Sequence, residues 1–387
     1  MKKKISILGS TGSIGKNLLN IIKKDKKNFE ITLLTARKNY KLLLKQANNF
    51  NVTNIIITDL NSFKKAKKIN KNKKINIYND FNVFDKIFRS KIDYTMSSII
   101  GLDGLYPTLE IIKYTKIIAI ANKEAIICGW DLIKKKLKIH KTKFLPVDSE
   151  HFSIWKIINY EKNKNIDQIF LTASGGPFLY KSINQIKNVS ISEALKHPNW
   201  KMGKKISIDS ATMMNKVFEL IEAKKIFDFE YNKLKILVHT QSYIHAIVKF
   251  SNGLTKILIH DTNMKFPIFN SLYENTKKKI NSKDLDLSIL NNLDLSEVNI
   301  KRFPTIKIIK RLPLKDSLFE TVLVSANDAL VDLFLNKQIK FTDISKILLK
   351  ISNSTEFTKY KSIEPKNIQQ ISKLVKYVSL KIYSMSV

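Results

Sequence analysis

The stretch KISILGSTGSIG, residues 4–15, decides the fold. Lys4–Leu8 is a short apolar run typical of a strand, and apolar residues recur at helical spacing from about Ile14 to Ile22. A strand, a glycine turn and a helix in this order open a βαβ unit, in which glycine amides and the helix N-terminus receive a pyrophosphate. The spacing GxxGxxG departs from the usual GxGxxG, so a surface turn is the alternative.

Glycine is informative here because it is scarce. The chain has only 10 glycines, and most of them are clustered. Three lie in the stretch above, two at Gly101 and Gly104, and two are adjacent at Gly175 and Gly176. Such clusters mark backbone that other residues do not readily form.

The second predicted strand, FEITLLTA, is followed by Arg37, Lys38 and Asn39. A site that prefers NAD carries an acidic residue at this point for the ribose hydroxyls. Two cations and an amide favour a 2′-phosphate instead, and so NADPH. A surface turn in a lysine-rich chain is the alternative.

Further strand-like runs at residues 54–58, 75–78, 94–97 and 116–120 alternate with helical stretches, which predicts a doubly wound α/β domain. Polar residues Asn122, Lys123 and Glu124 follow the last of these runs. Ligands of open α/β sheets bind at the carboxyl ends of strands, although a capping turn would have the same composition.

The next predicted strand, KTKFLPV, leads into Asp148, Ser149 and Glu150. If this segment is extended, Asp148 and Glu150 share a face, and both carboxylates can converge on one point. With a third carboxylate from a distant helix they would suit Mg²⁺ or Mn²⁺. An exposed turn is the alternative.

Three more stretches combine polar side chains with unusual backbone. In LTASGGPF, Ser174 precedes the Gly-Gly pair, which suits an anion or a tight turn. HPNWKMG, residues 197–203, predicts a loop that closes over a ligand with Trp200 as its cover, or one that packs on the core. DSATMMNKVFE, residues 209–219, is expected to be one helix capped by Asp209 or Ser210.

Composition narrows the function classes. A formal charge of +35 would suggest a nucleic-acid binder, but the 68 Lys and Arg residues include only four Arg, and the lysines are spread along the chain. We therefore expect no nucleic-acid partner. No run of 18 apolar residues occurs, so no membrane span is expected. The single cysteine, Cys128, permits no internal disulfide, which fits the cytoplasm.

Read together, GSTGSIG, ANKE, VDSEH, SGGPF, HPNW and DSATMMNK followed by Glu219 resemble, in order and spacing, the 1-deoxy-D-xylulose 5-phosphate reductoisomerase family. The resemblance runs from residue 4 to about 275 and continues weakly to the C-terminus, where SAND (residues 325–328) stands for a similar stretch. It implies that a ketose phosphate is rearranged to a branched aldehyde phosphate, which NADPH reduces to 2-C-methyl-D-erythritol 4-phosphate.

The resemblance also implies the roles of individual residues. Glu150 is the candidate for proton transfer, and Lys123 is expected beside the metal-bound oxygens. The implied metal ligands are Asp148, Glu150 and Glu219. The implied substrate contacts are Ser149 near the metal, Ser174, Ser210, Asn215 and Lys216 at the phosphate, and His197 and Trp200 in a closing lid. The implied NADPH contacts are Thr11, Gly12, Ser13 and Ile14 at the pyrophosphate, Arg37, Lys38 and Asn39 at the 2′-phosphate, and Asn122, Glu124 and Gly203 nearer the nicotinamide.

The chain departs from the family pattern at four places: Ala173, Lys201, the pair Val217-Phe218, and Arg37. None of these removes a functional group named above, so we expect activity. Two other functions compete with this interpretation. A semialdehyde dehydrogenase would need Cys128 as nucleophile, and a decayed cofactor-binding protein would not need the acidic residues and Lys123 intact.

The expected fold class is α/β. We expect a Rossmann-like NADPH domain at residues 1–148, an α+β catalytic domain at 149–275, a connector at 276–300 and a C-terminal helical bundle at 301–387. Two strands, VHTQSYIHAIVKF (residues 238–250) and LTKILIHD (residues 254–261), are expected in the catalytic domain around the turn Ser251-Asn252-Gly253. In the family such strands contribute to a dimer contact. We therefore expect a homodimer. His239 and His245 in this region are more readily explained as structural residues than as metal ligands.

Overall fold

The computed structural model describes residues 1–387 except 160, 162–164, 201, 275–276 and 386–387. Lys201, one of the departures above, therefore lies outside the described residues, as does the expected domain boundary at 275–276. The chain forms two compact units. The first unit comprises residues 1–125, 132–148 and 264–280, and the second comprises 126–131, 149–263 and 281–387.

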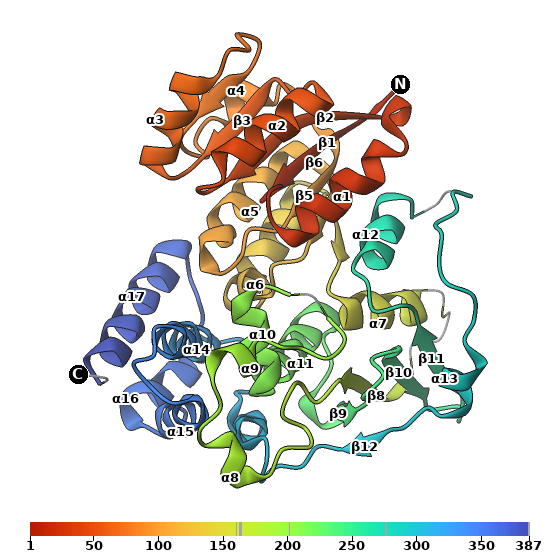
Figure 1. Ribbon diagram of the computed structural model, residues 1–387, viewed down its shortest axis with the longest axis vertical. Helices are drawn as coiled ribbons and strands as arrows, with labels where there is room; N and C mark the ends of the chain where they lie inside the picture. Colours follow the sequence, from red (N-terminus) through yellow and green to blue (C-terminus); the bar gives the residue numbers. More distant parts are fainter. Residues whose placement is uncertain (160, 162–164, 201, 275–276, 386–387) are drawn as a thin grey trace. The chain divides into compact units, whose positions relative to one another are not determined.

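The first unit is built on a seven-stranded parallel sheet with the strand order β4-β3-β2-β1-β5-β6-β7 (Figure 1). Its strands are β1 (Lys3–Leu8), β2 (Phe29–Ala36), β3 (Asn54–Ile57), β4 (Asn76–Tyr78), β5 (Ile92–Ser97), β6 (Thr115–Ile120) and β7 (Lys143–Pro146). The helices that begin in this unit are α1 (Ser13–Lys23), α2 (Tyr40–Phe50), α3 (Leu60–Ile69), α4 (Phe84–Ile87), α5 (Leu105–Ile111), α6 (Lys123–Ile139) and α12 (Lys265–Leu272).

This sheet confirms the predicted doubly wound pattern. From β1 the chain adds strands first on one side, β2 to β4, and then on the other side, β5 to β7. The carboxyl ends of β1 and β5 therefore lie at the topological switch point, where α/β folds bind ligands. The strands are apolar because helices cover them, and Ile5, Ile7 and Leu8 of β1 are fully buried. Residues 264–280, which the sequence placed in the catalytic or connecting regions, belong to this unit, and α12 packs on α1.

The second unit contains a five-stranded sheet with the order β11-β10-β8-β9-β12. Its strands are β8 (Ile166–Ala173), β9 (Leu234–Val238), β10 (Ile244–Phe250), β11 (Thr255–Ile259) and β12 (Ser296–Glu297). Helix α7 packs on β10 and β11, α11 packs on β8 and β9, and the two helices contact each other. The helices of this unit before the C-terminal group are α7 (Ser149–Asn159), α8 (Ile183–Ile186), α9 (Ile191–Ala194), α10 (Lys204–Ala211), α11 (Met214–Phe227) and α13 (Leu287–Asn291).

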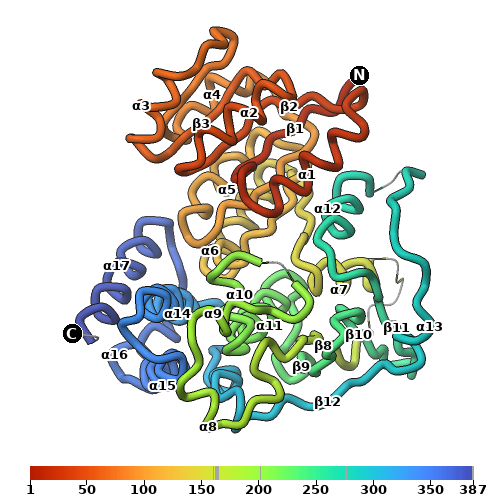
Figure 2. Tube along the Cα trace, viewed as in Figure 1, coloured from red at the N-terminus to blue at the C-terminus, as the bar shows by residue number. Residues whose placement is uncertain are grey.

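The C-terminal residues form the predicted group of helices, drawn in blue in Figure 2. Helix α14 is almost entirely buried and packs against α15 and α17. The members of the group are α14 (Phe319–Leu335), α15 (Phe341–Ile351), α16 (Thr355–Thr358) and α17 (Ile368–Ser384). Within the described residues, no helix has the length and apolar character needed to cross a bilayer.

Three local expectations were wrong, and in the first and third a turn interrupts the expected element. Residues 209–219 are two helices, since α10 ends at Ala211 and Met213 takes a left-handed conformation (φ 64°) before α11. Asp209 and Ser210 therefore end α10 instead of capping α11. Ser149 and Glu150 begin helix α7 and are not extended. The predicted strand through residues 238–250 begins only at Ile244, although its hairpin turn at Gly253 (φ 87°) is confirmed.

Candidate active site

The glycine turn after β1 has the geometry of a phosphate cradle. Gly9 has φ 88°, and a Cβ there would lie 2.8 Å from the carbonyl oxygen of Ser98. A Cβ at Gly15 would lie 2.5 Å from the Cα of Ser10, so the turn can only close with glycine. Helix α1 follows with Gly12 at its N-cap, no side-chain cap and no acidic residue in its first turn. This N-terminus fits an anion, as the pyrophosphate of a dinucleotide requires.

The residues expected at the 2′-phosphate follow β2. Asn39 caps α2, its side chain accepting a hydrogen bond from the Leu42 amide at 3.3 Å. Arg37 forms an ion pair with Asp103 at 3.1 Å, and both side chains are more than two-thirds exposed. Exposed pairs of this kind are weak, so Arg37 can exchange Asp103 for a phosphate at little cost.

Asn122 holds a loop together. Its side chain donates to the carbonyl oxygens of Ile99 and Gly101 and accepts from the Ala125 amide at 2.9 Å. Gly104 makes room for this side chain, since a Cβ there would lie 2.2 Å from Asn122 Nδ2. These contacts bind the end of β5 to the start of α6, and the expected contact of Asn122 with the nicotinamide ribose stays a prediction.

Lys123 and Glu124 begin α6 and are both buried. The Lys123 ammonium lies 3.2 Å from the Asp148 carboxylate. Asp148 is the last residue of this part of the first unit, and a single peptide bond joins it to Ser149 of the second unit. The ends of β6 and β7 thus place a cation and an anion together, as expected for strand ends of a parallel sheet.

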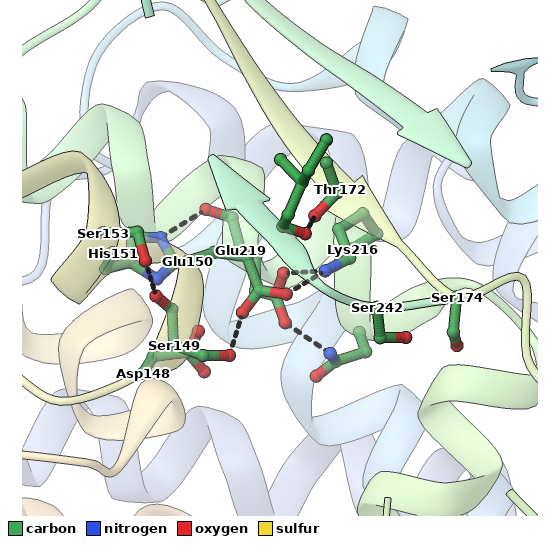
Figure 3. A network of polar contacts seen from close by, with 12 residues as sticks. Asp148, Ser149, Glu150, His151, Ser153, Thr172, Ser174, Lys216, Glu219 and Ser242 are labelled. Atoms are coloured by element: carbon green, nitrogen blue, oxygen red, sulfur yellow. Dashed lines mark hydrogen bonds and ion pairs between the residues drawn. The ribbon is translucent and has the colours of Figure 1, made fainter. Parts of the chain in front are cut away.

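In the second unit, Lys216 lies between two carboxylates (Figure 3). Its ammonium is 2.9 Å from Glu150 Oε1 and 2.5 Å from Glu219 Oε2, and all three side chains are largely buried. Burial alone would lower the pKa of Lys216, but the two carboxylates outweigh it and raise the pKa above its usual range. The ammonium is therefore a stable cation at this position.

The two carboxylates suit a divalent metal ion. Glu150 and Glu219 bring carboxylate oxygens within 4.8 Å of each other, and hard oxygen ligands are the donors that Mg²⁺ and Mn²⁺ prefer. Ser149 Oγ donates to Glu150 Oε2 at 2.5 Å, and Asn215 donates to Glu219 Oε1. The site already holds one cation, the Lys216 ammonium, so its residues fit a metal.

His151 is a supporting residue that the sequence did not single out. Its Nε2 lies 2.8 Å from the Glu219 carbonyl oxygen, and its Nδ1 lies 3.6 Å from the Glu222 carboxylate. His151 is fully buried, as is Glu222. The next residue after Glu150 therefore holds α11 in register beside α7. The motif VDSEH contains His151. The sequence did not indicate its contact with Glu222, because Glu222 lies far along the chain, three residues after Glu219.

The Gly-Gly loop contacts α10. Gly175 and Gly176 have φ 82° and 66°, and a Cβ at Gly176 would lie 3.0 Å from the carbonyl oxygen of Ser210. Ser174 Oγ accepts a hydrogen bond from the Gly176 amide at 3.2 Å. The loop thereby brings Ser174 close to the end of α10, where Ser210 lies, as an anion site built from both segments requires.

The predicted lid is fastened to the rest of the second unit. His197 Nδ1 accepts from the amides of Asn199 and Trp200, at 3.1 and 2.9 Å, so Nε2 carries the proton and donates to Ser174 Oγ at 2.9 Å. Burial and then the charge of Lys216 lower the pKa of His197 to about 4. Asn199, which sequence reasoning missed, donates to Thr240 and Ser242.

Trp200 and Gly203 complete this segment. The Trp200 ring is half-buried and lies edge-on to His245, with ring centroids 6.1 Å apart. Gly203 is the N-cap of α10, and a Cβ there would meet nothing within 4 Å. The cover role of Trp200, the motion of the lid and the nicotinamide contact of Gly203 stay predictions.

The residues considered for other functions are explained by their burial and by their contacts within the protein. Burial raises the pKa of Cys128, which is 1% exposed, so it is a poor nucleophile. His239 contacts the Asp294 carbonyl oxygen, and His245 stacks on His260. Among the described residues, neither His239 nor His245 belongs to a group of three metal-ligating side chains. Ala173, Val217 and Phe218, three of the departures, are buried in the core.

The fold and these sites define a class: dinucleotide-binding α/β oxidoreductases with a carboxylate metal site and an anion loop. Family models agree. The model of 1-deoxy-D-xylulose 5-phosphate reductoisomerase matches residues 5–129, its C-terminal domain matches 144–227, and the DXP reductoisomerase C-terminal domain matches 260–378.

Individual relatives agree as well. The reductoisomerase of Pelagibacter ubique is 62% identical over 387 residues, covering 100% of both chains. That of Clostridium kluyveri is 37% identical over 354 residues, 91% of this chain and 92% of the relative. The solved structure from Zymomonas mobilis in complex with NADPH is 30% identical, with TM-score 0.88, covering 100% of this chain and 99% of that chain. The chain belongs to the 1-deoxy-D-xylulose 5-phosphate reductoisomerase family.

Proposed function

We infer that this chain converts 1-deoxy-D-xylulose 5-phosphate to 2-C-methyl-D-erythritol 4-phosphate, a step of the non-mevalonate route to isoprenoid precursors. The reaction is a rearrangement followed by reduction, and it uses NADPH and a divalent metal ion. The observation that carries this conclusion is the pair Glu150 and Glu219 around one buried cation. A family structure 30% identical to this chain, with TM-score 0.88, contains NADPH, fosmidomycin and magnesium, covering 99% of this chain and 97% of that chain.

The proposed metal ligands are Asp148, Glu150 and Glu219. The peptide bond that joins Asp148 to Ser149 keeps this third carboxylate near the start of α7, where Glu150 lies. When bound, the metal ion, Mg²⁺ or Mn²⁺, polarises the substrate carbonyl and stabilises negative charge on the substrate oxygens. Ser149 hydrogen-bonds Glu150 and so orients it, and we also assign Ser149 to the substrate.

Proton transfer is assigned to Glu150. Its Oε2 accepts from Ser149, and its Oε1 faces the Lys216 ammonium. As a carboxylate, Glu150 can accept a substrate hydroxyl proton. Lys123 is placed beside Asp148 and supplies a positive charge for the substrate oxygens. Its burial excludes water that would screen that charge.

The phosphate of the substrate is assigned to Ser174, Ser210, Asn215 and Lys216. The Gly175-Gly176 backbone lets Ser174 approach the end of α10, and α11 carries the amide and the ammonium. A phosphate held here and carbonyl oxygens held near Glu150 fix both ends of a small substrate, which lowers the entropic cost of reaction. His197 and Trp200 would close over it and exclude water.

Most of the residues assigned to NADPH belong to the first unit, and Gly203 belongs to the second. Thr11, Gly12, Ser13 and Ile14 form the turn and first residues of α1 that receive the pyrophosphate. Arg37, Lys38 and Asn39 surround the 2′-phosphate, and Asn122, Glu124 and Gly203 lie nearer the nicotinamide. When bound, NADPH supplies the hydride that reduces the aldehyde.

Assembly and location are part of the same proposal. Strand β11 is an edge of its sheet, and Ile257 on it is 46% exposed, which supports a homodimer formed through this edge. The single cysteine supports a cytoplasmic location. The even spread of lysines supports a small-molecule substrate and no nucleic-acid or membrane partner.

The test is a direct assay. Purified protein with 1-deoxy-D-xylulose 5-phosphate, NADPH and Mn²⁺ or Mg²⁺ should lose NADPH absorbance and form methylerythritol phosphate. A chelator should stop the reaction, and added metal should restore it. A folded protein that binds NADPH but leaves this substrate unchanged would contradict the proposal and favour a decayed enzyme or another carbonyl substrate.

A further inference from the structure

The ammonium of Lys216 lies between Glu150 and Glu219, two of the carboxylates that would hold a metal ion. One oxygen of each carboxylate contacts Lys216 Nζ, at 2.9 and 2.5 Å (Figure 3). The second oxygen of Glu150 accepts from Ser149, and that of Glu219 accepts from Asn215. One oxygen of each carboxylate therefore contacts the same cation, and that cation comes from the protein.

A divalent ion and the ammonium need the same two oxygens. Lys216 is 5% exposed, and Glu219 is 1% exposed, so water does not screen the charges here. Two cations held by one pair of buried oxygens repel each other strongly. If a metal ion were held by both Glu150 and Glu219, Lys216 would therefore have to move away.

A second position for the ammonium lies toward the anion loop. Lys216 follows Asn215 in the first turn of α11, and its charge reaches His197, whose Nε2 donates to Ser174. A phosphate beside Ser174 and Ser210 would attract the ammonium toward that side. The lysine side chain is a flexible chain of four carbons, so the ammonium can change partners while the backbone of α11 stays in place.

We propose that Lys216 is the internal counter-cation of the metal-free site, and that metal binding and phosphate binding are coupled because both release it from Glu150 and Glu219. This inference rests on the proposed function, since it takes the metal ligands and the phosphate site from there. It adds a thermodynamic consequence: each ligand strengthens the binding of the other by the same factor.

The coupling can be measured on the wild-type protein without substrate. Mn²⁺ affinity is determined from the electron paramagnetic resonance signal of unbound Mn²⁺, with and without methyl phosphate. The weak complex of Mn²⁺ with methyl phosphate is measured without protein and subtracted. We expect methyl phosphate to tighten Mn²⁺ binding roughly tenfold, within the usual range of coupling between sites. Mn²⁺ affinity that does not change with methyl phosphate would overturn the inference.

A variant provides the second arm. Lys216→Met keeps the length of the side chain and removes its charge, so Mn²⁺ should bind roughly tenfold more tightly to this variant than to wild type. Lys225→Met is the matched control, because Lys225 lies on the same helix between Asp316 and Glu320 and is equally buried. The control should bind Mn²⁺ as wild type does. Unchanged or weaker Mn²⁺ binding to Lys216→Met would overturn the inference.

The outcome is independent of the proposed reaction. If the wild-type protein turns over 1-deoxy-D-xylulose 5-phosphate with Mn²⁺ but shows no coupling, the function stands and the counter-cation role fails. If the coupling is present but this substrate is not turned over, the proposed function fails and the exchange at Lys216 stands. The wild-type coupling measurement also decides the matter should Lys216→Met not fold.

Discussion

At the scale of single residues, the buried Glu219 carboxylate has both contacts within the protein and an assigned role in metal binding. It faces the Lys216 ammonium at 2.5 Å and accepts from Asn215, and we assign it to the metal. Glu219→Gln keeps the shape of the side chain and removes the charge. We expect the turnover rate to fall about 100-fold or more through weakened metal binding, with the NADPH dissociation constant nearly unchanged.

Steady-state kinetics and NADPH fluorescence titration would measure these two effects separately. Glu356→Gln is the control, because Glu356 lies on α16 in the C-terminal helices and pairs with Lys381. It should leave turnover as in wild type. An equal loss of turnover and NADPH binding in Glu219→Gln would refute the metal assignment.

His197 is held neutral. Its folded-state pKa is lowered from 6.5 to about 4 by burial and by Lys216, so the unfolded chain takes up a proton there between these pH values and the folded chain does not. The stability that His197 contributes is present above pH 6.5 and is lost as pH falls through 4. Proton NMR of the imidazole should show titration near pH 4.

The same measurement tests the phosphate site. A phosphate ester beside Ser174 would favour a charged imidazole, so adding methyl phosphate should move the His197 titration to higher pH. His197→Gln identifies the resonance by its absence. Titration of His197 near pH 6.5 without any ligand would contradict the contacts that bury this ring.

At the scale of elements, the anion loop depends on two glycines whose partners are far along the chain. Gly176 has φ 66°, and its missing Cβ would lie 3.0 Å from the Ser210 carbonyl oxygen. Gly176→Ala should cost about 1–2 kcal/mol for the left-handed backbone and roughly 1 kcal/mol more for overpacking against α10. It should also raise the Michaelis constant for the substrate.

Gly253→Ala is a matched control for this prediction. Gly253 has φ 87° in the hairpin between β10 and β11, and a Cβ there meets nothing within 4 Å. It should lose only the backbone contribution and keep the wild-type Michaelis constant. Urea unfolding gives the free energy of unfolding of both variants. Equal losses of this free energy would mean that the contact with Ser210 does not contribute to the cost of Gly176→Ala.

Elements with a regular pattern were predictable from the sequence. The alternation of strands and helices in the first unit gave β2 with its observed bounds and β1, β3, β5 and β6 to within two residues at either end. The break within residues 209–219 was not predictable in this way. The left-handed turn position is occupied by Met213, and a methionine does not indicate such a turn as a glycine would. Helix α7 was missed because it begins at Ser149, only a few residues after β7 ends at Pro146, and the extended segment was expected to continue through Glu150.

The active-site residues were predictable as a set but not in their contacts. The ordered motifs brought Glu150, Lys216 and Glu219 to attention, and the structure places them together. Periodicity puts Lys216 on α11, but it does not show that the ammonium turns toward Glu150, which is 66 residues away in the chain. Such a contact depends on the packing of α7 against α11.

At the scale of the whole molecule, the exposed edge strand β11 is the feature that indicates association with a second copy of the chain. Residues Thr255, Lys256 and Ile257 of β11 are exposed, and Leu254 before them is 58% exposed. An edge with unpaired backbone groups and apolar side chains associates with another edge unless it is protected. We therefore expect a dimer of twice the 44.7 kDa chain in solution.

Ile257→Lys should convert this dimer to a monomer, because a charge placed at the strand edge opposes burial of the neighbouring edge. Light scattering after size exclusion gives the mass directly. Leu314→Lys is the control, since Leu314 is 80% exposed in the same unit and lies outside the sheet, so it should remain dimeric. A wild-type protein that is monomeric at micromolar concentration would refute the dimer. A dimer that survives Ile257→Lys would place the interface elsewhere on the chain.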